Sequence, residues 1–519
     1  MPPSLLAIDL GTGSCRAALF DSSGRQLSIG QREWSHPGLA GVPGSQIFDT
    51  TRNWRLIGDC IRDALASGGV AAHEIAAVSS SSMREGMVLY DAAGGEIWAC
   101  PNVDSRSAKQ ASELVVSGAA RRIYEQGGDW VSITSPARFL WIREHEPEVF
   151  AAIAHMGMLS DWVLYRLTGR FLTDPSCGSS SNLFDLASRS WSRESLSLIG
   201  LSEAVMPDVV EPGTVIGSVT ELAAAETGLV AGTPVVVGGA DTQLGLVGIG
   251  VVGPDRVTLL GGSFWQMTVV TDRPLIDPEA RLRTLCHAVP GQWMTEGIGF
   301  YSGIAMRWYR DAFCELEKAE AARRGIDPYA VMEEAAAAIP AGSNGVLATF
   351  SNVMDAKRWV QAPPSFVGFN VDDAAGSGRR AAIRALEEQA AYAARGHLEI
   401  IESLTGRSYP EIVFTGGAAK GRLWPQIVAD VLDRPVKVPA VVESTALGAA
   451  FYAGLGVGLF RTLDEVAERV VRMERMVEPN PANRHVYDAS YAAWTQVYPR
   501  MLQLAEDGLS RPMWWPAGA

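Results

Sequence analysis

Short apolar runs separated by glycine-rich turns open the chain. Residues 5–9 (LLAID) and 16–20 (RAALF) have the length and composition of strands, and the turn GTG at residues 11–13 lies between them. Residues 53–66 then carry apolar side chains at helical spacing, and residues 75–78 have the pattern of a buried strand. The pattern predicts a strand–turn–strand unit, followed by a helix and another strand.

A similar unit begins about halfway along the chain. Residues 256–260 (RVTLL) and 265–270 (WQMTVV) are strand-like, with the turn GGS at 261–263 between them. Helical and strand patterns alternate after it, including a long helical stretch over residues 378–404. We therefore expect an α/β fold of two domains with related cores, in which helices cover the sheets. The boundary is set at residue 248, where the stretch 248–253 (GIGVVG) has the composition of a hinge.

Length and charge narrow the classes of protein. The chain has 519 residues, more than one domain of about 100–250 residues would use. Its formal net charge of −14 argues against nucleic acid or an anionic membrane as the main partner. An acidic surface of this kind is also what solubility alone requires.

The cysteines and the apolar runs indicate a cytoplasmic location. None of the six cysteines forms a C-x-x-C pair, so we expect a reducing compartment and no structural zinc. The N-terminus lacks a basic region, and Asp9 interrupts its apolar stretch, which makes it a poor signal peptide. Residues 444–460 are uncharged but Gly-rich and shorter than the ~20 residues of a spanning helix, so we expect a closely packed buried helix there.

Two glycine turns have the composition of phosphate-binding loops. In the first, Asp9 ends a buried strand and Thr12, Gly13 and Ser14 follow, so the carboxylate could hold a hydrated Mg²⁺ while the turn surrounds phosphate oxygens. Gly262-Ser263 form the matching turn of the second half. A plain hairpin turn is the alternative for each, but a facing pair would grip a polyphosphate from both sides.

Two further strand ends carry candidate chemistry. The β-branched run 235–237 leads through two glycines to Asp241, where a carboxylate can accept the proton of an attacking hydroxyl. The alternative is an N-cap. The run 412–414 ends in the pair Gly416-Gly417, which lets a purine or a phosphate approach the backbone, or which serves only helix–strand packing.

Polar pairs after other strands could bind the hydroxyls of a small molecule. They are Arg84-Glu85, Asp104 with Arg106, and Asp161, and an exposed ion pair is the alternative for each pair. No P-loop, protein-kinase signature, G-x-S-x-G or H-E-x-x-H occurs in the chain.

In this order and spacing, the motifs resemble the FGGY carbohydrate kinases, which have the actin-like (ribonuclease H-like) ATPase fold, and the likeness runs from Leu5 to about Val497. Within that family the chain is similar to the autoinducer-2 kinases. The stretches that carry this likeness are 34–36, 82–90, 97–104, 261–266, 306–314, 363–366 and the tail ending in Trp514-Trp515.

The resemblance implies a role for each motif. Asp241 matches the general base, and Asp9 and Asp241 match the carboxylates around Mg²⁺. Residues around ATP would be Thr12, Gly13, Ser14, Gly262, Ser263, Gly303, Arg307, Gly417 and Gly421, and residues around the substrate would be Arg84, Glu85, Asn102, Asp104, Asp161 and Trp265. Residues 1–248 would bind mainly the sugar and residues 249–519 mainly ATP, with a cleft between them.

Two departures from the family pattern stand out. Many relatives have Asn or Ser where Gly421 stands, so a contact there would be through the backbone. The segment 126–129 (QGGD) replaces an expected Thr-Gly-Gln beside the substrate pocket, which makes substrate identity less secure than reaction type.

The expected function is ATP- and Mg²⁺-dependent phosphorylation of the primary hydroxyl of 4,5-dihydroxypentane-2,3-dione. A kinase for xylulose, ribulose, erythritol or glycerol is the second reading, and a non-catalytic nucleotide sensor of the same fold is the third. The resemblance also implies association with the histidine phosphocarrier protein and a homodimer as partners to test.

Overall fold

The computed structural model describes residues 3–254, 256–355, 360–440 and 443–514, and its first half is organised by a six-stranded sheet. The strand order is β12-β13-β4-β1-β2-β3. β1, β2 and β3 are antiparallel neighbours, whereas β4 and β13 run parallel to β1. The bounds are β1 Ser4–Leu10, β2 Ser14–Asp21, β3 Gln26–Glu33, β4 Ile75–Ser82, β12 Val215–Ser218 and β13 Pro234–Ala240.

The second half repeats this arrangement. Its seven-stranded sheet has the order β16-β17-β15-β14-β20-β21-β22, again with an antiparallel hairpin next to parallel strands. β17-β15-β14-β20-β21 therefore matches β3-β2-β1-β4-β13, which confirms the related cores predicted from the two glycine turns. The bounds are β14 Val257–Gly261, β15 Trp265–Thr271, β16 Arg283–Cys286, β17 Trp293–Gly299, β20 Ile412–Thr415, β21 Val436–Pro439 and β22 Met473–Val477.

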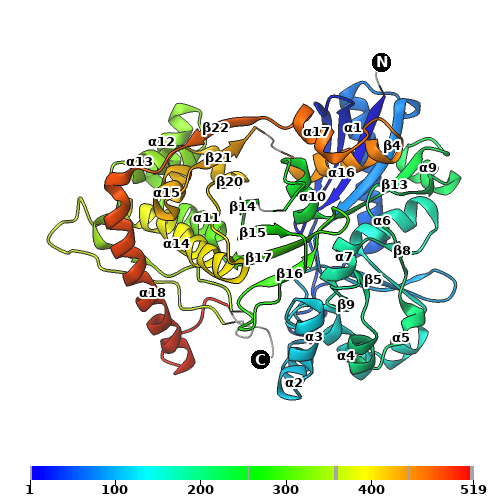
Figure 1. Ribbon diagram of the computed structural model, residues 1–519, viewed down its shortest axis with the longest axis horizontal. Helices are drawn as coiled ribbons and strands as arrows, with labels where there is room; N and C mark the ends of the chain where they lie inside the picture. The colour runs from blue at the N-terminus through cyan, green and yellow to red at the C-terminus, as the bar shows by residue number, and fades with distance from the viewer. Residues whose placement is uncertain (1–2, 255, 356–359, 441–442, 515–519) are drawn as a thin grey trace.

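Helices cover both sheets, and Figure 1 shows the two halves side by side. In the first half they are α1 Thr50–Gly68, α2 Ala108–Val116, α3 Ala119–Gly127, α4 Ser135–His145, α5 Pro147–Ala152, α6 Leu159–Thr168, α7 Pro175–Ser180, α8 Arg193–Ile199, α9 Glu221–Thr227 and α10 Asp241–Gly248. Those that follow are α11 Ser302–Phe313, α12 Glu315–Arg324, α13 Pro328–Ala337, α14 Arg379–Thr405, α15 Leu423–Leu432, α16 Ser444–Gly456, α17 Leu463–Val470 and α18 Arg484–Glu506.

Shorter strands complete the chain. A three-stranded sheet, β6 Glu96–Cys100, β5 Met87–Tyr90 and β7 His155–Met158, stands beside the first sheet. Two-stranded pairs are formed by β8 Leu172–Thr173 with β11 Asp208–Val209, β9 Phe184–Asp185 with β10 Ser190–Trp191, and β18 Leu347–Ala348 with β19 Phe366–Val367.

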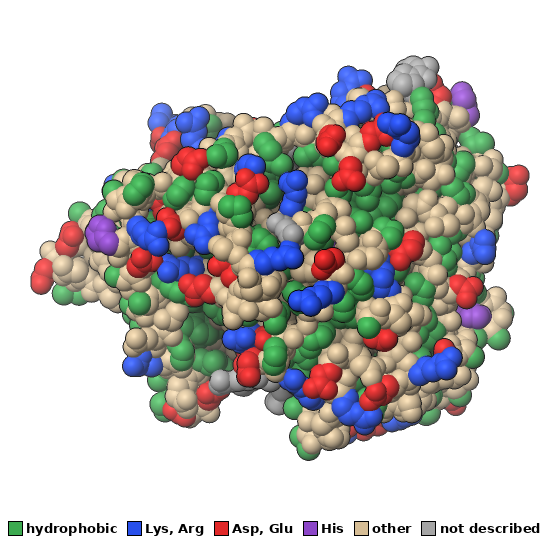
Figure 2. Space-filling model, in the orientation of Figure 1, with side chains coloured by type: hydrophobic (Ala, Val, Ile, Leu, Met, Phe, Trp, Pro, Cys, Tyr) green, Lys and Arg blue, Asp and Glu red, His purple; other side chains and the backbone are tan. Residues whose placement is uncertain are grey.

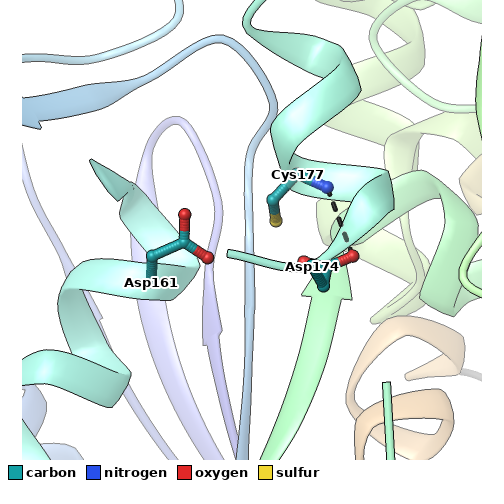
Figure 3. A group of neighbouring side chains, drawn as sticks. All are labelled: Asp161, Asp174 and Cys177. Carbon is teal, nitrogen blue, oxygen red and sulfur yellow. Dashed lines mark hydrogen bonds between the residues drawn. The ribbon is translucent and has the colours of Figure 1, made fainter. Parts of the chain in front are cut away.

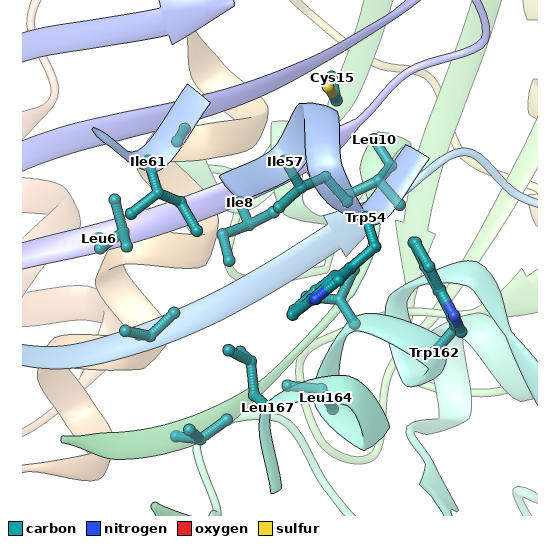
Figure 4. Packing of buried hydrophobic residues seen from close by; sticks show 14 of the residues in the cluster. Leu6, Ile8, Leu10, Cys15, Trp54, Ile57, Ile61, Trp162, Leu164 and Leu167 are labelled. Carbon is teal, nitrogen blue, oxygen red and sulfur yellow. The ribbon is translucent and has the colours of Figure 1, made fainter. Parts of the chain in front are cut away.

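β1 is buried on both faces because helices lie on each side of the first sheet. Successive residues of a strand point to opposite faces. Leu6 and Ile8 pack with Trp54 and Ile57 of α1 (Figure 4). Leu5 and Ala7 belong instead to a cluster with α10 and α16. Apolar residues on both faces of β1 are therefore buried, and Asp9 is the polar residue near its end.

The chain crosses back to the first half near its end. α16 and α17 lie with the first sheet, and β22 returns to the second (Figure 1). A Cβ on Gly448 would stand 2.0 Å from the carbonyl oxygen of Leu244, and one on Gly248 would stand 1.9 Å from that of Ser444, so α10 and α16 can meet only through these glycines. The expected buried helix over 444–460 is thus confirmed as α16, and the predicted hinge begins at a packing contact.

Charges of both signs are interspersed over the face seen in Figure 2. Among the described helices, none combines the length and the apolar character that crossing a membrane requires. All six cysteines are buried free thiols.

Candidate active site

Asp9 lies at the end of β1 facing the second half, and it is 5% exposed. Burial raises its pKa to about 7, although the nearby Arg16 guanidinium opposes the shift. Arg16 bridges Asp9 at 3.6 Å and Glu443, just before α16, at 3.3 Å. Oδ1 of Asp9 has no protein partner. A buried carboxylate with one uncommitted oxygen fits a hydrated divalent cation.

The turn after Asp9 is held by hydrogen bonds from side chains to its carbonyl groups. The Trp34 indole N–H donates to the carbonyls of Gly11 and Thr12 at 3.0 and 3.2 Å, and Nε2 of His36 lies 3.0 Å from the second. The Thr12 hydroxyl also contacts Oδ1 of Asn102 at 3.2 Å. The N–H of Gly11 donates to the carbonyl of Ser14 at 2.9 Å, so the N–H groups that follow it are the candidate contacts for phosphate oxygens.

Asp241 is the first residue of α10, directly after β13. Burial raises its pKa, and the positive charge of Arg84 partly offsets that effect. The negative charge of Asp241 also contributes to the raised pKa of Asp9, so the two carboxylates are near enough to interact. The N-cap alternative is wrong: Ala240 holds that position, while Oδ1 of Asp241 accepts the N–H of Thr242 at 2.7 Å and the Thr242 hydroxyl at 3.4 Å.

The loop after β4 carries Arg84 and Glu85, 5% and 4% exposed. Glu85 has a φ of 61°, a left-handed conformation that is costly for a residue other than glycine. Both side chains form buried ion pairs with the second half, Arg84 with Glu296 at 2.7 Å and Glu85 with Arg283 at 2.9 Å. The exposed surface pair considered from the sequence is therefore wrong for these residues.

A residue outside the predicted set holds two loops of the site together. Arg138, from α4, is fully buried and donates to the carbonyls of Glu85, Pro101, Asn102 and Asp104. A charged residue within the apolar run 136–142 was the sequence signal that could have identified it.

Asp104 is fully buried, and its carboxylate accepts hydrogen bonds that stabilise the loop around it. Its Oδ2 accepts the N–H of Gln46 at 2.7 Å and the Nε–H of Arg106 at 2.8 Å. Its Oδ1 has no protein partner, so one acceptor remains.

Asp161 and Trp265 lie apart from the Arg84 loop. Asp161 accepts the N–H of Met158 at 2.8 Å and faces Asp174 and Cys177 (Figure 3). Burial and the neighbouring Asp174 raise its pKa well above the usual range, so a neutral carboxyl is favoured. Trp265 is 1% exposed and packs on Phe414 in the second core.

In the second half, the candidate nucleotide site consists largely of glycine backbone after β20. Gly416 and Gly417 line a cavity of about 240 Å³ together with Arg16, Lys420 and Glu443, so it joins both halves. Gly416 has a φ of 96°, and a Cβ there would stand 2.7 Å from the carbonyl oxygen of Gly261. This close approach brings the ends of β14 and β20 together.

Helix α11 is tied to the second glycine turn. The N–H of Gly303 donates to the carbonyl of Ser263 at 3.1 Å, and a Cβ on Gly303 would stand 2.1 Å from the carbonyl oxygen of Gly262. Arg307, one turn further, is exposed. A Cβ on Gly421 would stand 2.6 Å from the Glu333 carboxylate, so a side chain at that position would require Glu333 to move.

Fold and site together define a phosphotransferase of the two-domain actin-like class. Two models match the chain, the FGGY family of carbohydrate kinases, N-terminal domain, over residues 4–248 and the C-terminal domain over residues 258–457. The protein belongs to this family and is a carbohydrate kinase that uses ATP as co-substrate.

Relatives and solved structures agree with this assignment. The chain is 43% identical over 517 residues to the autoinducer-2 kinase of Yersinia enterocolitica, covering 99% of this chain and 98% of that protein. Identity to the autoinducer-2 kinase of Salmonella paratyphi B is also 43%, with coverages of 99% and 97%. The xylulose kinase structure from Rhodospirillum rubrum has a TM-score of 0.84 at 26% identity, covering 97% of this chain and 100% of that chain. The Plasmodium falciparum glycerol kinase structure with ADP shares the fold, with a TM-score of 0.81 at 18% identity and coverages of 96% and 98%.

Proposed function

We propose that this kinase phosphorylates autoinducer-2, 4,5-dihydroxypentane-2,3-dione, at its primary hydroxyl as a step in quorum-signal processing. The observation that carries the proposal is identity of 43% along 99% of the chain to proteins named autoinducer-2 kinase. The joint placement of Asp241, Asp9 and the Arg84–Glu85 loop supports a phosphoryl transfer to a hydroxyl at this site.

Residues 1–248 mainly bind the sugar-like substrate in this proposal, and residues 249–519 mainly bind ATP. Support comes from the charged side chains at the strand ends of the first sheet and from the glycine turns of the second. The cavity lined by Gly416 and Gly417 accommodates the nucleotide, and Gly262, Ser263 and Gly303 approach its phosphates. Arg307 and Gly421 lie further out, at the adenosine side.

Asp241 acts as the general base. Burial raises the pKa of Asp241 and so makes its carboxylate a stronger proton acceptor than an exposed one, which favours transfer of a proton from the attacking hydroxyl. Arg84 orients the carboxylate by charge, and Glu85 and Asn102 accept hydroxyl groups of the substrate. Asp104 retains a free acceptor oxygen, while Asp161 and Trp265 support the pocket from behind.

Asp9 and Asp241 are the groups that would hold Mg²⁺. Bound there, the ion would neutralise charge on the phosphoryl oxygens. Backbone N–H groups of Thr12, Gly13 and Ser14 supply the same kind of stabilisation from the protein itself. Closure of the two halves around the glycines near residue 248 excludes water, which would otherwise receive the phosphoryl group. X-ray scattering with an ATP analogue and substrate tests the closure, and unchanged dimensions would contradict it.

Two alternatives come from specific observations. A kinase for a pentulose or polyol is favoured by the likeness to the xylulose kinase and glycerol kinase structures. A nucleotide sensor without sugar phosphorylation shares the fold, but it would not require the polar set around Asp241.

A coupled ADP-release assay separates these functions. The panel contains Mg²⁺-ATP with dihydroxypentanedione, xylulose, ribulose, erythritol or glycerol, each at several concentrations. Selective turnover of dihydroxypentanedione is the expected result. Selective turnover of another compound would replace the substrate and keep the mechanism, whereas ATP binding without turnover of any compound would favour the sensor.

The proposal includes a cytoplasmic location and two associations. Six buried free thiols are consistent with a reducing compartment. A homodimer and a complex with the histidine phosphocarrier protein follow from the resemblance, and sedimentation velocity with and without that carrier tests both.

A further inference from the structure

A buried cluster of five charged side chains joins the two halves beside Asp241. Arg283 on β16 and Glu296 on β17 are direct cross-strand partners in the second half. Arg84, Glu85 and Asp129 come from the first half. All five side chains are 0–6% exposed.

Arg283 is the centre of this cluster. Its Nη1 lies 2.9 Å from Oε1 of Glu85 and 3.2 Å from Oδ2 of Asp129, and its Nε donates to Glu296. Arg84 donates to the same Glu296 oxygen at 2.7 Å. Two guanidinium groups therefore share three carboxylates, and one guanidinium connects residues from both halves of the chain.

The backbone fixes Arg283 against the divergent segment 126–129. The N–H of Thr284, the next residue, donates to the carbonyl of Gly128 at 2.9 Å. Gly128 has a φ of 76°, and a Cβ there would stand 2.2 Å from the carbonyl oxygen of Thr284. A side chain at position 128 would separate β16 from this segment. The glycine is thus what brings Asp129 within reach of Arg283.

The balance of charge leaves capacity for hydrogen bonds. Burial disfavours ionisation of Glu296, but Arg84 and Arg283 outweigh it and hold its pKa below the usual range. Burial raises the pKa of Asp129, and Arg283 only partly offsets the shift. Burying so many ions is expensive, and apolar residues of similar volume often give equal stability. A cluster with more carboxylates than cations suits a ligand rich in hydroxyl groups.

We propose that Arg283 and Asp129 are specificity-determining residues of the sugar site, with Glu296 as the positioning residue that bridges Arg283 and Arg84 and fixes both guanidinium groups. Asp129 accepts hydroxyl protons, and Arg283 donates to adjacent oxygens at the end of the substrate away from the attacking hydroxyl. The ligand class is a small acyclic carbonyl compound, or its hydrate, with neighbouring oxygen substituents. The sugar site is complete only when the second half contributes Arg283. This inference rests on the proposed kinase function.

Steady-state kinetics of Asp129→Asn, Arg283→Lys and Arg283→Met test the proposal. Each charge-assisted hydrogen bond lost should raise the KM of the sugar-like substrate about 10- to 100-fold, while the KM of ATP stays within about threefold. Arg283→Lys keeps the positive charge but not the planar set of guanidinium donors. Its KM for the sugar-like substrate should therefore lie between those of the wild type and Arg283→Met. Arg281→Lys is the matched control, because Arg281 lies two residues before Arg283, outside the cluster, and its side chain pairs with Asp277.

The outcomes separate this inference from the proposed function. If the wild type does not turn over dihydroxypentanedione, the same KM comparison is made with the panel compound that it does turn over. The result with that compound then decides the inference. An unchanged KM in Asp129→Asn and Arg283→Lys would overturn it. Equal rises in both KM values, together with a lower melting temperature, would also overturn it, because that pattern indicates a structural role. Should Arg283→Met fail to fold, the isosteric Asp129→Asn decides.

Discussion

The two sheets have the same topology but present different chemistry at the cleft. In the first, β1 carries Asp9 one residue before its end, β4 leads to Arg84 and Glu85, and β13 leads to Asp241. In the second, β14 ends at Gly261, β20 leads to Gly416-Gly417, and β21 ends at Pro439. At these strand ends, the first half therefore supplies charged side chains, and the second half supplies mainly glycine backbone.

This difference follows from what each ligand requires. A hydroxyl substrate must be deprotonated and oriented, which takes carboxylates and guanidinium groups at fixed positions. A nucleotide presents a flat base and phosphate oxygens, which approach a bare backbone closely. Removing a charge from the first half should thus reduce turnover, and adding a methyl group to a glycine of the second half should weaken ATP binding.

The largest effect is expected for Asp241→Asn. The change removes the proton acceptor but little volume, so kcat should fall about 10²- to 10⁴-fold. Binding of ATP, measured by calorimetry, should stay close to wild type. Asp59→Asn is the control, since Asp59 forms only an exposed pair with Arg62. Near wild-type turnover in Asp241→Asn would mean that another group is the base.

Asp9→Asn should separate metal binding from folding. Because burial raises the pKa of Asp9 to about 7, the folded protein holds a proton that the unfolded chain releases above about pH 3.8. Wild-type stability should therefore fall as pH rises from about 4 to 7, relative to the variant, by at most about 4 kcal/mol.

Urea unfolding across this pH range, in EDTA and in excess Mg²⁺, measures the Asp9 effect. Mg²⁺ should raise the free energy of unfolding of the wild type more at pH 7 than at pH 5. It should raise that of Asp9→Asn much less. A variant that follows the wild type at every pH, with equal Mg²⁺ protection, would remove Asp9 from the metal site.

In the second half, Gly303→Ala should act through packing. The added methyl group would meet the carbonyl of Gly262 at 2.1 Å, so the turn and α11 must move apart. Overpacking of this kind costs about 1–3 kcal/mol, and the KM of ATP should rise with it. Gly253→Ala is matched to it, because a Cβ at Gly253 meets nothing within 4 Å. Equal stability of the two variants in thermal melts would contradict the close approach.

The sequence predicted local elements and strand ends better than long-range partners. The two hairpins, the helix over 378–404 and the strand before Asp241 follow from apolar spacing and turn residues, which are local properties. The candidate phosphate turns and the candidate base Asp241 were identified in this way, because residues at strand ends have a local signature.

Residues that act across the fold lacked such a signature. Arg283 pairs with Glu85, 198 positions away, and nothing near either residue indicates the other. Arg138 binds carbonyl groups, which every residue has, so its partners leave no trace in the sequence. Trp265, expected at the substrate, is buried in the second core, where an inward position on β15 favours a large apolar side chain.

The smallest effect, and the sharpest test of the bare-backbone half, is expected for Gly417→Ala. No atom lies within 4 Å of a Cβ at Gly417, and its φ is not left-handed, so stability should change by less than about 0.5 kcal/mol. The methyl group would nevertheless project beside the cavity that we assign to ATP, so the KM of ATP should rise about 3- to 10-fold while the sugar KM is unchanged. ADP-release kinetics with thermal melts measures both quantities. An unchanged KM for ATP would place the nucleotide elsewhere along the cleft, whereas a loss of stability would mean that Gly417 serves packing and not access.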